Sequence, residues 1–144
     1  MTIKEEQEKI IDEFAILDGD QEMTNFYIME LGQKLPEMPE EDKTDKNIVK
    51  GCQSKVWLTS SNDKGRVTYH ADSNTAITKG LVSLLVRIFS DQPAADIVGA
   101  EVFFPEKIGM SRFIGTQRSN GFAAMIKQMK LEALAYQAMT KQSN

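Results

Sequence analysis

The sequence predicts an α+β fold, in which helices flank a small antiparallel sheet of about three strands. Two helical patterns open the chain, two short alternating runs follow at 56–59 and 67–69, and further helical patterns close it. Helices and strands that are segregated along a chain in this way are typical of α+β domains.

Apolar residues recur at helical spacing over residues 3–17 and again over 23–35. Gly19 ends the first pattern, and the rings of the prolines that begin at Pro36 oppose continuation of the second. The charged stretch 40–46 then predicts an exposed loop, after which Ile48 and Val49 could begin a strand.

The segment 61–65, Ser-Asn-Asp-Lys-Gly, carries the turn residues of a hairpin. If Ser61 pairs with Arg66, the register places Lys55 opposite Asp72. The only histidine, His70, then lies near Trp57.

The run 75–90 is apolar almost all round, which predicts a buried helix with Ser73 or Asn74 as its cap. The segment 91–93, Asp-Gln-Pro, resembles the cap and first turn of a short helix. A final amphipathic helix is expected to begin near Ser119 and to present its methionines to the core.

Length and charge limit the classes of function. The 144 residues suit one domain spanning 1–144, and the net charge of −4 argues against a general binder of nucleic acid. No apolar run approaches the roughly 18 residues of a membrane span, and the N-terminus lacks a signal-peptide layout. We therefore expect a cytoplasmic protein that binds neither nucleic acid nor membrane.

Cys52 is the only cysteine and follows a turn glycine, Gly51, at the tip of a predicted loop. One thiol cannot form an intramolecular disulfide, so its chemistry is that of a nucleophile or of a transient carrier. A lone cysteine is also often an inert, buried residue. The residues alone leave both interpretations open, because thiol reactivity depends on surroundings that a sequence does not show.

Two kinds of site are disfavoured. His70 lies about three positions along the predicted ladder from Cys52, at roughly 3.3 Å per residue, which is too far for direct proton abstraction in a Cys–His hydrolase. Zinc and iron–sulfur sites usually need three or four Cys or His ligands, and the chain has two such residues. We expect no bound metal.

Four blocks in matching order resemble the SufE/CsdE family of sulfur-acceptor proteins, over nearly the whole chain. They are residues 27–36, 49–57, 71–81 and 118–122. The resemblance implies a SufE/IscU-like fold and a sulfur-transfer accessory protein rather than a stand-alone enzyme. It implies that the protein takes persulfide sulfur from a SufS-type cysteine desulfurase, stimulates that enzyme, and delivers sulfur to a SufBCD-type iron–sulfur scaffold.

By the same resemblance, Cys52 carries the persulfide, and the supporting or partner-binding residues are Gly51, Gln53, Asp72 and Arg118. Pyridoxal phosphate would belong to the partner desulfurase, so no cofactor is expected here. In place of the family's usual Gly-Asp-Ser and acid, residues 71–74 read Ala-Asp-Ser-Asn, which removes a second carboxylate.

Other interpretations of these residues remain. A cluster scaffold like IscU would need several ligands, so the cysteine count argues against it. A regulatory module that binds a desulfurase, with an incidental Cys52, is the alternative from another class. Asp72 could simply cap a helix and Arg118 could be a solvated residue. The apolar strand beside Cys52 leads us to expect a buried thiol, although the start of the 75–90 helix would favour a thiolate facing it.

Overall fold

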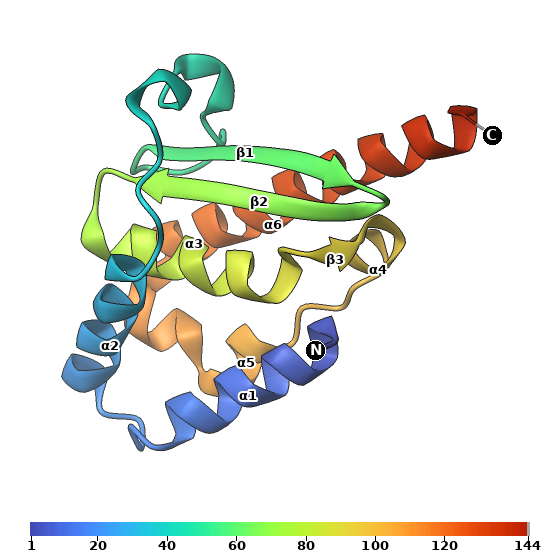
Figure 1. Ribbon diagram of the computed structural model, residues 1–144. Coiled ribbons are helices and arrows are strands. Elements are labelled where there is room, and N and C mark those ends of the chain that lie inside the picture. The colour runs from blue at the N-terminus through green and yellow to red at the C-terminus, as the bar shows by residue number, and fades with distance from the viewer. Residues whose placement is uncertain (144) are drawn as a thin grey trace.

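The computed structural model describes residues 1–143 and confirms the α+β class, with a three-stranded antiparallel sheet in the order β1-β2-β3 (Figure 1). The elements are α1 (Ile3–Ala15), α2 (Gln21–Gln33), two 3-10 turns η1 (Glu40–Asp42) and η2 (Asp45–Asn47), β1 (Val56–Asp63), β2 (Arg66–Ser73), α3 (Ala76–Phe89), β3 (Gln92–Pro93), α4 (Ala94–Val98), α5 (Phe104–Ile108) and α6 (Met110–Ser143).

The hairpin of β1 and β2 lies along one side of the molecule, and α3 and α6 run beneath it (Figure 1). Helices α1, α2 and α5 lie on the far side of α3 and α6 from the sheet. Tyr69 joins the layers, because its buried hydroxyl donates to the Met129 carbonyl of α6 at 2.6 Å. Within residues 1–143, no helix is long and apolar enough to cross a membrane.

The two predicted N-terminal helices are present, and each has a side-chain cap. Thr2 and Glu5 form a reciprocal capping box on α1, and Asp20 accepts from the Met23 N–H at the start of α2. Arg87 of α3 contacts the carboxylates of Glu6 and Glu13 on α1. This ion-pair network fixes α1 against the central buried helix.

The predicted hairpin register is wrong by two residues. Asp63 pairs with Arg66, so Trp57 rather than Lys55 lies opposite Asp72. The turn consists of Lys64 and Gly65 alone, with φ angles of 54° and 88°. Two positive φ angles match the twist of a two-residue hairpin, and this allows both strands to extend to eight residues.

Three further expectations about element ends are corrected. Residues 92–93 form β3 rather than a helical turn, and α4 begins at Ala94. The cap of α3 is Thr75, not Ser73 or Asn74. The last helix begins slightly before Ser119, because α6 starts at Met110 and its long C-terminal part follows the non-helical break at Gly115.

The crossing of α2 and α3 depends on glycine. A Cβ atom on Gly80 would lie 1.9 Å from the Ile28 carbonyl oxygen, so the two backbones are in direct contact. A backbone carbonyl cannot move aside as a flexible side chain can. The crossing therefore requires Gly80.

We predict that Gly80→Ala lowers the free energy of unfolding by about 3 kcal/mol or more, because the added methyl must separate two helices. Gly99→Ala is the control, since its Cβ would meet only the Ala95 oxygen at 3.4 Å. Urea denaturation measures both variants. Equal stability of the two would contradict this account of the crossing.

Candidate functional site

Cys52 lies in a short loop, residues 50–55, whose two ends are paired. The Val49 N–H donates to the Val56 carbonyl at 2.8 Å, and Ile48 forms an antiparallel bridge with Trp57. Ile48 and Val49 therefore do not begin a full strand, and their extended pairing is limited to one bridge. Gly51 has a φ of +97°, a conformation that favours glycine.

The C-terminal end of the loop is fastened to the segment that precedes α3. The Lys55 N–H donates to Asn74 Oδ1 at 3.0 Å, and the Lys55 carbonyl accepts from Ser73 Oγ at 2.8 Å. Ser54 Oγ accepts from the hydroxyls of Thr75, at 3.0 Å, and Thr78, at 3.3 Å. The side chains expected to cap α3 therefore hold the cysteine loop instead.

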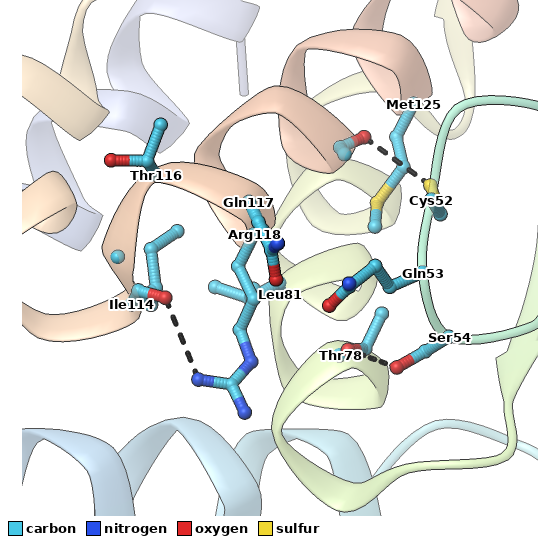
Figure 2. Close-up of a pocket in the computed structure, with 12 residues that line it drawn as sticks. Cys52, Gln53, Ser54, Thr78, Leu81, Ile114, Thr116, Gln117, Arg118 and Met125 are labelled. Atoms are coloured by element: carbon cyan, nitrogen blue, oxygen red, sulfur yellow. Dashed lines mark hydrogen bonds between the residues drawn. The ribbon is translucent and has the colours of Figure 1, made fainter.

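The Cys52 thiol points toward α6, where it donates to the Gly121 carbonyl at 3.4 Å (Figure 2). The side chain is half-buried against the core. Burial raises the pKa of the Cys52 thiol. The sulfur faces a carbonyl oxygen, which pairs with the protonated thiol and repels a thiolate, so the resting state is an S–H group.

A pocket of about 390 Å³ lies beside this thiol. Its wall comes from the cysteine loop, from α3 and from both sides of the break in α6 (Figure 2). The lining residues are Cys52, Gln53, Ser54, Thr78, Leu81, Ile114, Gly115, Thr116, Gln117, Arg118, Gly121 and Met125. The pocket is large enough for a side chain or loop tip of another molecule.

The structure brings Cys52, Gln53 and Arg118 together at this pocket. Arg118 is exposed, and its Nη1 donates to the Ile114 carbonyl at 3.5 Å, so the guanidinium extends along its own helix rather than toward the sulfur (Figure 2). Gly51 lies outside the lining, where a Cβ would come 3.1 Å from that of Ala124.

Asp72 is placed behind the loop and not in the pocket. Its carboxylate is buried and lies 3.3 Å from Lys43 Nζ and 3.3 Å from Lys79 Nζ. Burial alone would raise the pKa of Asp72, but the Ser73 N–H and the two ammonium groups outweigh it and lower that pKa. Asp72 is therefore a charged carboxylate at neutral pH.

His70 pairs with Thr59 and is exposed, so it lies further along the hairpin from Cys52 than the sequence predicts. In the described part of the chain, residues 1–143, no three His, Cys, Asp or Glu side chains gather as a metal site would require. The thiol thus has a backbone carbonyl, rather than an imidazole, as its hydrogen-bonding partner.

Sequence reasoning missed several residues of the site. Gly121 and Lys79 stand within motif blocks, but only their three-dimensional contacts show that one accepts from the thiol and the other pairs with Asp72. Lys43 belongs to a charged stretch that predicts only a solvated loop. The pocket wall around Gly115 depends on a break in α6, which the spacing of apolar residues in the sequence does not predict.

Comparisons with known proteins place the sequence in one family. The family described as "SufE: Fe-S metabolism associated domain" matches residues 8–133. An uncharacterized SufE-like protein of Rhizobium meliloti (strain 1021) is 39% identical over 133 residues, covering 88% of this chain and 93% of the relative. Another, from Rhizobium etli, is 39% identical over 131 residues, covering 88% of each chain.

A structural relative supports the fold alone. The solution structure of a hypothetical protein from Thermus thermophilus superposes with a TM-score of 0.74, covering 94% of this chain and 96% of that one. The two sequences are 17% identical, so the likeness concerns the backbone arrangement and carries no residue roles.

We predict that alkylation of Cys52 by iodoacetamide in the free protein follows an apparent pKa above the ordinary thiol value of about 8.5. At neutral pH the rate is then lower than that of an exposed thiol, because less thiolate is present. The control is Cys52→Ser combined with Ser61→Cys, which places the thiol on the exposed part of β1. A Cys52 profile at or below the control's pKa would contradict the sheltered geometry.

Proposed function

This chain belongs to the SufE family of iron–sulfur metabolism proteins, and from that premise we propose that Cys52 accepts a sulfur atom from a cysteine desulfurase. The observation that carries the proposal is one thiol, half-buried at the edge of a pocket that another protein's side chain can enter. A transferable sulfur needs a single acceptor thiol. It also needs an entry route, which the pocket offers.

The transfer is a thiol–persulfide exchange. The Cys52 thiolate attacks the terminal sulfur of a persulfide on the donor's cysteine. A new S–S bond forms on Cys52, the bond between that sulfur and the donor's cysteine breaks, and the donor leaves as a thiolate. The proton from Cys52 passes to that thiolate through water. Because one S–S bond breaks as another forms, the exchange involves no net oxidation.

The family and this chemistry support a proposal for the partners. A SufS-type desulfurase is the proposed donor, and its pyridoxal phosphate generates the persulfide, so this protein needs no cofactor of its own. A SufBCD-type scaffold is the proposed recipient, and the cytoplasm is the proposed location. The protein acts as an accessory in sulfur transfer rather than as an enzyme in isolation.

We predict that incubation with a cognate desulfurase and free cysteine adds one sulfur atom to Cys52, which intact-protein mass spectrometry detects and a reductant removes. Cys52→Ser folds but gains no sulfur and loses stimulation of the desulfurase. The absence of an adduct with a desulfurase proven to bind would refute the proposal. Full stimulation by Cys52→Ser would instead establish a regulatory binding module.

We predict that Arg118→Ala reduces stimulation of the desulfurase roughly fivefold, since an exposed guanidinium at the pocket can pair with a partner carboxylate. The variant's stimulation should also depend less on salt. Arg112→Ala is the matched control, because Arg112 is an exposed arginine of α6 on the other side of Gly115, outside this pocket. Equal effects of the two substitutions would exclude a specific role for Arg118.

A further inference from the structure

We propose that Asp72 is a positioning residue that holds both ends of the Cys52 loop through Lys43 and Lys79. The inference rests on the proposed function for its place in sulfur transfer and deepens it, because it names what keeps the acceptor thiol against α6. Neither the family description nor the names of the relatives assign such a role.

The Asp72 carboxylate is buried, so its negative charge must be balanced by nearby positive or hydrogen-bonding groups. Asp72 faces the outer side of β2, yet its side chain is only 5% exposed. A charge so buried destabilises the protein unless it is paired and hydrogen-bonded. Asp72 Oδ2 lies 3.3 Å from Lys43 Nζ, while Oδ1 lies 3.3 Å from Lys79 Nζ and accepts from the Ser73 N–H at 2.8 Å.

Lys43 connects Asp72 to the N-terminal end of the loop. It lies between η1 and η2, and η2 ends at Asn47, directly before Ile48. Its ammonium also lies 5.8 Å from the centre of the Trp57 ring and 3.1 Å from Glu40. Trp57 is both the register partner of Asp72 and the bridge partner of Ile48, so the Lys43 cation lies against the residue that pairs with the N-terminal end of the loop.

The C-terminal end of the loop is held from the same carboxylate. Ser73, whose N–H Asp72 binds, uses its hydroxyl to bind the Lys55 carbonyl, and the next residue, Asn74, binds the Lys55 N–H. Lys79 adds a tie to the first turns of α3, where Thr75 and Thr78 hold Ser54.

These contacts show that Asp72 does not cap a helix. The cap of α3 is Thr75, which has no side-chain capping bond, and the Asp72 oxygens accept from Ser73 and pair with two lysines instead. Without the negative charge, two ammonium groups would face each other across an amide or a void. The base of the loop would then open more often, and Cys52 would leave Gly121 without a partner protein to release it.

The test compares Asp72→Asn, Lys43→Met and Lys79→Met with wild type. Arg66→Met is the control, because it removes the exposed Arg66–Asp91 ion pair at the opposite end of the same strand. Three quantities are measured on the isolated protein: the alkylation rate of Cys52 by iodoacetamide, the apparent pKa of that reaction, and stability to urea.

Asp72→Asn should raise the alkylation rate roughly tenfold and each lysine variant about threefold, as expected for loss of charge-assisted bonds to a buried carboxylate. The apparent thiol pKa should fall toward its ordinary value in the same order, whereas Arg66→Met changes neither. The effect on alkylation must also exceed what the change in global stability explains, which separates loop release from general unfolding.

An Asp72→Asn protein that is less stable but has an unchanged alkylation rate and thiol pKa would overturn the proposal and leave Asp72 a purely structural residue. If this variant does not fold, unchanged alkylation in both lysine variants overturns it equally. The assay needs no desulfurase. A failure here therefore leaves persulfide formation on Cys52 untouched, and a failure of persulfide formation leaves this result standing.

Discussion

The contact between the cysteine loop and the backbone of α6 is the constraint on which the rest of the site depends. The loop can approach α6 because the facing residues of the helix, Gly121 and Ala124, are small. Gly51 also adopts a positive φ angle, which glycine accommodates without steric strain. The Cys52 thiol can then donate directly to a main-chain carbonyl. Bulkier residues at these positions would hold the loop away from the helix and open the thiol to solvent.

This arrangement suits the sulfur-carrier role that we propose, because it meets two requirements of such a role. A reactive thiolate in the free protein would meet small thiols and oxidants before it met its donor. Burial and a carbonyl neighbour keep Cys52 protonated, at the cost of slower attack. In the proposed mechanism a partner shifts this balance by pulling the loop from α6, and the pocket beside the sulfur is where it would bind.

The sequence predicted those features that depend on local patterns. The helices, the hairpin, the lone thiol after a turn glycine and the fold class all follow from periodicity, turn chemistry and the motif blocks. The register did not follow, because Lys64 adopts a positive φ that propensities disfavour for a lysine. The break at Gly115 and the lysines around Asp72 arise from tertiary packing, which brings residues 43, 72 and 79 together from three separate segments.

The central claim is that Cys52 is sheltered in the free protein and released by its donor. The most direct measurement is the alkylation rate of Cys52 with and without a desulfurase whose own catalytic cysteine has been replaced by alanine, so that docking occurs without sulfur transfer. The account predicts slow labelling of the free protein and clear acceleration in the complex. Rapid labelling of the free protein at neutral pH, unchanged by a desulfurase shown to bind, would contradict it.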